Sequence, residues 1–263
     1  MIIEVDSAAT YIYTGAQSFK EVLPSIVFIH GGGCDHTVWV LQSRYFANHH
    51  YNALAVDLPG HGRSEGDLCT SIEDYADWII KMLNELRISQ AVVAGHSMGS
   101  LVALECAARH PTRVSHLALI GTATPMPVTD ELLNAAGENA AEAFDMINIW
   151  GHTLGHIGGH RAPGMWMMGG TVRLLQRSGP GVLHNDLNAC NTYKVGGSAA
   201  KVTCPTTLIL GELDMMSPPK RAQTLVESIP NSTVNEVIGS GHMLMAEKPD
   251  EVLESLVRLV TSN

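Results

Sequence analysis

Six short apolar runs recur along the chain, and stretches with helical periodicity separate them. The runs occupy residues 25–30, 52–57, 91–95, 116–121, 206–211 and 233–238. Most of them are rich in β-branched residues and show little polar alternation, which is typical of strands covered by helices on both faces. Helices are predicted at 37–48, 73–86, 98–109, 219–228 and 249–261. This alternation predicts an α/β fold with a mostly parallel, doubly wound sheet, in which ligands bind at the carboxyl ends of the strands.

The alternation stops between residues 122 and 201. This stretch shows no convincing strand pattern and is rich in Met, Gly, His and Trp, as in MINIWGHTLGHIGGH. The strand pattern resumes at Thr206. We therefore expect a core formed by residues 1–121 and 202–263, with residues 122–201 inserted as a mostly helical cap over the edge of the sheet.

Composition and charge narrow the classes of partner. With 263 residues and 45% hydrophobic content, the chain can bury a sizeable core. Its formal net charge of −10 argues against nucleic acid or an anionic membrane, because both select basic surfaces. The five cysteines include no C-x-x-C pair, and neither a signal peptide nor a membrane-spanning apolar run is visible. We expect a cytoplasmic protein that acts on a small molecule, as a monomer or a dimer.

A G-x-S-x-G motif follows one of the predicted strands and opens a predicted helix. It reads Gly95-His96-Ser97-Met98-Gly99. A serine in this context is held in a strained, exposed turn, and the start of the next helix favours negative charge beside it. The motif predicts Ser97 as a nucleophile, with the N–H of Met98 as one donor to an oxyanion.

A second oxyanion donor is predicted in the glycine run IHGGGCDH, which follows the strand at 25–30. Three consecutive glycines let backbone N–H groups approach a substrate oxygen without side-chain obstruction. Gly32 is the first choice for this donor and Gly33 the second.

A serine nucleophile needs a base and a carboxylate that orients the base. Asp214 lies just after the strand at 206–211, and His242 lies in a glycine-rich loop before the last helix. Along the chain the serine comes first, the acid second and the histidine third, which is one of the orders in which catalytic triads occur. Glu212 is a rival for the acid, and His242 is preferred among thirteen histidines because it alone follows the second-last strand.

Together these segments resemble the α/β-hydrolase superfamily over nearly the whole chain outside the insertion. IHGGGCDHTVW resembles its oxyanion loop, AVDLPGHGRS a structural turn, GHSMGS its nucleophile elbow, GELD its acid turn and GSGHMLMAEKP its histidine loop. The resemblance implies an α/β-hydrolase fold in which the insertion is a cap that walls the substrate pocket. It also implies that His30 and His96 serve as packing residues. We expect no cofactor, because the mechanism needs only protein groups and water.

Serine at the elbow favours acyl transfer and leaves three functions open. The first is hydrolysis of a carboxylic ester or lactone of a small to medium, fairly apolar substrate. The second is hydrolysis of a carbon–carbon bond or an enol-lactone in aromatic degradation, for which an inward arginine from the cap would be expected, namely Arg161, Arg173 or Arg177. The third is a non-catalytic protein that binds a small ligand in the same pocket.

Large apolar residues of the insertion could line that pocket or form the cap's own core. The candidates for the pocket are Met126, Met146, Trp150, Trp166 and Met167. His152, His156 and His160 recur every fourth residue, as metal ligands on one helix face would. Nearby glycines weaken that helix and no carboxylate joins the set, so we expect no metal site.

Overall fold

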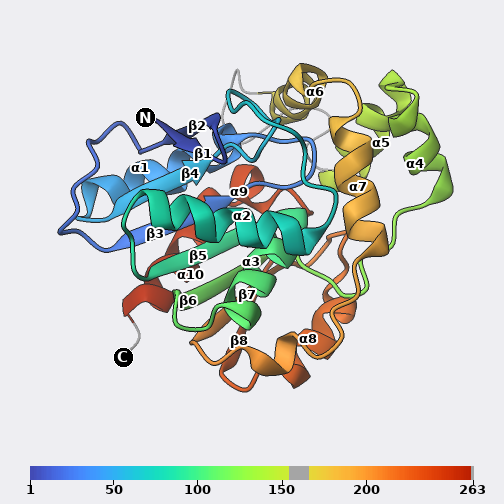
Figure 1. Cartoon of the computed structure of the whole chain (residues 1–263). Helices are drawn as coiled ribbons and strands as arrows, with labels where there is room; N and C mark the ends of the chain where they lie inside the picture. The colour runs from blue at the N-terminus through green and yellow to red at the C-terminus, as the bar shows by residue number, and fades with distance from the viewer. Residues whose placement is uncertain (154–165, 262–263) are drawn as a thin grey trace.

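The computed structural model describes residues 1–153 and 166–261. Eight strands form one sheet in the order β1-β2-β4-β3-β5-β6-β7-β8, and every neighbouring pair from β4 to β8 is parallel. The helices flank this sheet (Figure 1), so the predicted α/β-hydrolase fold is confirmed. The strands are β1 Ile2–Val5, β2 Ala8–Tyr13, β3 Ser25–Ile29, β4 Asn52–Val56, β5 Ala91–His96, β6 Val114–Ile120, β7 Thr206–Gly211 and β8 Ser232–Val237.

The N-terminal hairpin of β1 and β2 was not predicted from the sequence. Its two strands pair antiparallel, and β2 joins the rest of the sheet through an antiparallel pairing with β4. Most of their residues are partly buried or exposed. Short strands of this kind, at and next to the edge of the sheet, lack the continuous apolar run that identifies the central strands.

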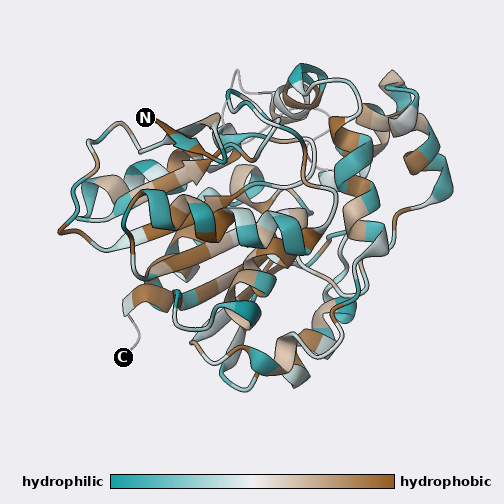
Figure 2. Cartoon of the chain, in the orientation of Figure 1, coloured by the Kyte–Doolittle hydropathy of each residue, from teal (hydrophilic) through white to brown (hydrophobic). Residues whose placement is uncertain are grey.

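Helices cover both faces of the sheet and place their apolar sides against it (Figure 2). On one face α1 and α10 pack through Phe46, Val252 and Leu256 against Phe28 and its neighbours. The other face is covered by α2, α3 and α8. Their bounds are α1 Val40–Asn48, α2 Ile72–Glu85, α3 Met98–Arg109, α8 Gln223–Ser228, α9 Leu244–Glu247 and α10 Pro249–Thr261, with 3-10 turns at His36–Trp39, Ala199–Lys201 and Pro219–Ala222. Within the described residues, no helix has the length and hydrophobicity to cross a lipid bilayer.

Among the described residues, four further helices lie between β6 and β7, at one end of the sheet (Figure 1). They are α4 Asp130–Gly137, α5 Ala141–Gly151, α6 Met167–Arg177 and α7 Val182–Thr192. They share a small apolar cluster that includes Leu132, Ile147, Leu175 and Leu187, which is separate from the two clusters beside the sheet. These contacts support our proposal that residues 122–201 form a cap unit.

Candidate active site

Ser97 lies in a strained turn between β5 and α3. Its φ of 53° and ψ of −121° fall in a region that residues other than glycine rarely adopt, because this backbone conformation costs about 1–3 kcal/mol. A Cβ at Gly95 would overlap the carbonyl oxygen of Gly99, and a Cβ at Gly99 would overlap the carbonyl oxygen of Ile29. The two glycines of the motif are therefore required by the close contact of strand and helix, and they hold Ser97 at the carboxyl edge of the sheet.

Two backbone N–H groups beside Ser97 are available to an oxyanion. Met98 is the first residue of α3, and a helix leaves the N–H groups of its first turn without an intrahelical acceptor. The N–H of Gly32 donates a hydrogen bond to no acceptor among the described residues. Gly33, the second choice from the sequence, donates its N–H to Asp186 Oδ2 at 2.8 Å. Because that amide is occupied, Gly33 is removed from the candidate oxyanion donors, and Gly32 and Met98 stay.

Asp214 and His242 form a buried, hydrogen-bonded pair. Asp214 Oδ2 accepts from His242 Nδ1 at 2.8 Å, and the two residues are only 4% and 2% exposed. Asp214 Oδ1 accepts from the backbone N–H groups of Met216 and Ser217 at 2.9 and 2.7 Å. Burial alone would raise the pKa of Asp214, but the adjacent His242 and the hydrogen bonds outweigh it, so this pKa is lowered. The carboxylate therefore stays ionised and fixes the proton of His242 on Nδ1, which leaves Nε2 as an acceptor.

Other residues near the site that could act as the acid or as the nucleophile do not fit these roles. Glu212 is exposed, and its Oε2 accepts from the Gly239 N–H at 2.8 Å, so it supports the turn rather than His242. Cys34 and Cys190 line the same cavity as Ser97. Burial raises the pKa of the Cys34 thiol to about 12 and also raises that of Cys190. Both cysteines are thus neutral thiols near pH 7 and weak nucleophiles.

Ser97 and His242 both line one cavity of about 440 Å³. No hydrogen bond within the described residues joins their side chains; such contacts are often long in free enzymes and shorten in the substrate complex. Gly32 and Met98 also line the cavity. The segment between β6 and β7 contributes apolar side chains to its wall, which include Met126, Val128, Leu132, Ile147, Trp150 and Leu187.

The structure brings some of the predicted pocket residues to the cavity beside Ser97 and places others elsewhere. Met126 and Trp150 line the cavity. Met146 does not, because it packs partly buried against the cap's own apolar cluster. Trp166 and Met167 instead border a separate shallow depression beside Thr37 and Val38, and Trp166 is 68% exposed. One reason applies to the three residues that lie elsewhere: a hydrophobic side chain in this segment can face the cavity, the solvent or its neighbouring helices.

The matches to known proteins agree with this geometry. Residues 26–255 match the model of the alpha/beta hydrolase family. The chain belongs to that family. This alpha/beta hydrolase is 28% identical over 253 residues to the pimeloyl-[acyl-carrier protein] methyl ester esterase of Nitrosospira multiformis, covering 89% of this chain and 94% of the relative. A thermophilic esterase of solved structure is 27% identical, with a TM-score of 0.82 over 99% of this chain and 96% of that one.

A further relative matches over a shorter segment. The (E)-2-((N-methylformamido)methylene)succinate hydrolase of Acinetobacter baylyi is 34% identical over 96 residues. This match spans 36% of each of the two proteins, so this chain matches about a third of that relative's length. All three relatives are named as hydrolases or esterases.

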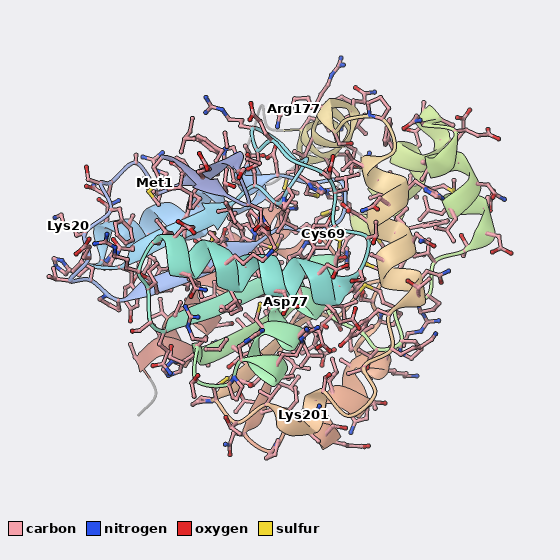
Figure 3. All side chains as sticks on the ribbon, in the orientation of Figure 1. Met1, Lys20, Cys69, Asp77, Arg177 and Lys201 are labelled. Carbon is pink, nitrogen blue, oxygen red and sulfur yellow. The ribbon has the colours of Figure 1, made fainter. Side chains whose placement is uncertain are left out.

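The cap histidines and arginines of this alpha/beta hydrolase do not form a site in the described part of the chain. His156, His160 and Arg161 lie outside the described residues. His152 Nδ1 contacts the Asn148 carbonyl at 2.9 Å. Arg173 donates a hydrogen bond to Gln176, and Arg177 donates one to Asp35 at 2.8 Å. Arg177 is labelled in Figure 3, at the edge of the molecule beside α6. Neither of these two arginines lines the cavity beside Ser97.

Two functional candidates were missed by the sequence analysis. Arg221, in the turn before α8, lines the cavity although it belongs to the core rather than the cap. Asp186, on α7, is fully buried against the glycine loop that follows β3. Neither residue lies in a recognisable motif, and only the packing of distant segments reveals its position.

The two histidines beside the site predict a stability that depends on pH. Burial lowers the pKa of His30 to about 4 and that of His96 to about 3. Between pH 6 and 4.5, unfolding therefore binds nearly two extra protons at these two histidines. Their contribution should lower the free energy of unfolding by about 2–3 kcal/mol per pH unit as the pH decreases through this range. His61, whose pKa is raised in the fold, contributes its full stabilisation below pH 6.5 and leaves this slope unchanged.

Urea unfolding at pH 6.5, 5.5 and 4.5 measures this slope. The variant His96→Asn should lose about half of it, because one of the two proton-binding groups is removed. A slope that is the same in wild type and variant would contradict the assignment of His96 as a buried neutral group.

Proposed function

We propose that this protein is a serine hydrolase that cleaves a carboxylic ester or lactone of a small to medium, fairly apolar substrate. The observation that carries the proposal is a serine in a strained turn that shares one cavity with a histidine bonded to a buried carboxylate. The proposed catalytic residues are Ser97, His242 and Asp214. The esterase names of two relatives support the same class of bond.

The proposed reaction proceeds through an acyl-enzyme. Ser97 Oγ attacks the carbonyl carbon and gives its proton to His242 Nε2, while the carbonyl electron pair moves to the oxygen. The N–H groups of Gly32 and Met98 stabilise this oxyanion. The oxyanion then collapses, the alcohol departs with the proton from His242, and a water deprotonated by His242 hydrolyses the ester to Ser97. Every step uses protein groups and water, so the proposal includes no cofactor.

The cavity supports a fairly apolar substrate of modest size. Its volume of about 440 Å³ lies within the usual range for small-molecule sites. Met126, Met216 and Met243 line it together with Trp150, and flexible methionines adapt to ligands of varied shape. The five cysteines form no disulfide, which supports the cytoplasm as the proposed location.

One charged residue favours a second candidate, a substrate that carries a carboxylate in addition to the bond that is cleaved. Arg221 is the one arginine or lysine among the described residues that line the cavity. No ion pair or hydrogen bond from the described part of the chain occupies its guanidinium. A guanidinium binds a carboxylate through paired hydrogen bonds. The succinate in the name of one relative's substrate supports this candidate, which includes enol-lactones and carbon–carbon bonds next to a ketone.

Replacing Arg221 by methionine tests the second candidate. For the methyl monoester of a dicarboxylic acid, the KM of Arg221→Met should rise about 10–100-fold, because a hydrogen bond between charged groups contributes about 1.5–3 kcal/mol. For a neutral methyl ester of the same length, the KM should stay within twofold. Lys220→Met is the control, since Lys220 is an exposed neighbour that does not line the cavity. Equal effects of Arg221→Met on both esters would exclude a carboxylate site at Arg221.

A series of esters and lactones, with the Ser97→Ala variant as the control, tests the proposed function itself. Short and long p-nitrophenyl esters, neutral lactones and ring-cleavage products separate the candidate reactions. A wild-type chain that bound one ligand tightly and turned over none of these compounds would favour the ligand-binding alternative.

A further inference from the structure

A cap helix buries a carboxylate against the glycine loop that supplies the proposed oxyanion donor. Asp186 of α7 is fully buried, and four groups donate to it. Oδ2 accepts from the Gly33 N–H and from His61 Nε2, both at 2.8 Å. Oδ1 accepts from the Tyr75 hydroxyl at 3.0 Å and from Asn185 Nδ2 at 3.3 Å. The donors come from the glycine loop, the turn after β4, α2 and α7, so this one carboxylate joins the cap to three segments.

His61 must carry a positive charge in this arrangement. Its Nε2 faces the Asp186 carboxylate, and its Nδ1 faces the Pro59 carbonyl at 2.9 Å. Both partners are acceptors, so both ring nitrogens donate a proton. Burial alone would lower the pKa of His61, but Asp186 outweighs it and the pKa is raised. A buried ion pair whose hydrogen bonds are all satisfied holds its groups in a defined geometry.

The same contacts fix the direction of the Gly32 N–H. The carbonyl of Gly31 accepts from the Cys34 N–H at 3.2 Å and faces His30 Nδ1 at 2.8 Å. Because the carbonyl and N–H of a trans peptide point in opposite directions, these bonds aim the Gly32 N–H away from them. The next peptide is held by the bond from Gly33 to Asp186, and a Cβ at Gly32 would lie only 3.1 Å from the Asp186 Cβ.

We propose that Asp186 is a positioning residue that holds the glycine loop from the cap, so that the Gly32 N–H faces the oxyanion formed at Ser97. This inference rests on the proposed function, because it assigns a role within the same site. It implies that the cap contributes to the chemical step as well as to the substrate pocket.

A second contact between cap and core supplies a matched control. Tyr193, at the end of α7, donates its hydroxyl to Glu105 of α3 at 2.6 Å, and both side chains are buried. This bond ties the same helix to the core but does not contact the glycine loop. Tyr193→Phe should therefore loosen the cap without moving the Gly32 N–H.

The experiment compares Asp186→Asn with Tyr193→Phe in the full chain. In Asp186→Asn the kcat on a p-nitrophenyl ester should fall about 10–100-fold with KM within threefold, because a loss of donor alignment acts on the transition state. A trifluoromethyl ketone adds to Ser97 and forms an oxyanion, so its Ki should rise by a similar factor. In Tyr193→Phe, kcat and this Ki should stay within threefold of wild type, even if the melting temperature falls as far as it does in Asp186→Asn.

Three results would overturn the positioning role. They are an unchanged kcat in Asp186→Asn, a kcat that falls equally in Tyr193→Phe, and a loss of kcat without a change in the Ki of the ketone. If Asp186→Asn does not fold, Tyr75→Phe removes one donor from the same carboxylate. It should lower kcat two- to fivefold at constant KM, and an unchanged kcat would also contradict the role.

The failure of this inference can be told from the failure of the proposed function. The proposed function fails if the wild-type chain hydrolyses no ester or lactone, or if Ser97→Ala does so equally well. The positioning role fails while wild-type activity and its dependence on Ser97 are intact.

Discussion

Replacing Ser97 by alanine should lower kcat on any ester that the wild type hydrolyses by about a millionfold, to a rate near background. The effect is this large because serine, histidine and carboxylate act as a unit, and the loss of the nucleophile removes the acyl-enzyme route. The fold should persist, since the Ser97 side chain is only partly buried and no hydrogen bond in the described part of the chain depends on its hydroxyl. Steady-state hydrolysis and circular dichroism measure the two expectations.

Covalent labelling gives an independent measurement of the same assignment. A fluorophosphonate should modify the wild type once, at Ser97, and should not modify Ser97→Ala. Ser217 is the matched control, because it is the other serine that lines the cavity. Ser217→Ala should still be labelled. Turnover and labelling that persist in Ser97→Ala would exclude Ser97 as the nucleophile.

The sheet and the elbow could be predicted because their signals are local. Continuous apolar runs located the central strands to within two residues, as at β7, where the predicted range 206–211 is the observed one. Ser97 needs two flanking glycines within five residues, and this requirement is written directly in the sequence. β1 and β2 escaped prediction because strands near the edge of a sheet, with partly exposed side chains, carry a weak version of the strand pattern.

The lining of the cavity beside Ser97 is harder to predict from the sequence, because it depends on how distant segments pack. Met126 and Met146 look alike in the sequence, yet the first lines the cavity and the second packs within the cap. Arg221 precedes a short core helix and still reaches the cavity. Asp186 looks like an ordinary polar position of a helix, and its burial follows from contacts to residues more than one hundred positions earlier. No local pattern encodes contacts of that kind.

The variant Asp214→Asn should lower kcat about ten-thousandfold with a small change in stability, and the geometry explains why an isosteric change is so severe. Oδ1 accepts two backbone N–H groups, from Met216 and Ser217. The asparagine must place its carbonyl oxygen there, which turns its NH₂ group toward His242 Nδ1. That nitrogen must then accept a hydrogen bond, so the ring proton moves to Nε2 and His242 cannot deprotonate Ser97. A wrong tautomer of this kind costs about 10⁴ in kcat in serine hydrolases.

Glu212→Gln is the matched control, because it makes the same carboxylate-to-amide change two residues away. The glutamine oxygen can still accept from the Gly239 N–H, as Glu212 Oε2 does at 2.8 Å, and no tautomer changes. Its kcat should therefore stay within twofold of wild type. If Glu212→Gln lost more activity than Asp214→Asn, the acid would be Glu212, and the hydrogen bond between Asp214 and His242 would serve only the fold.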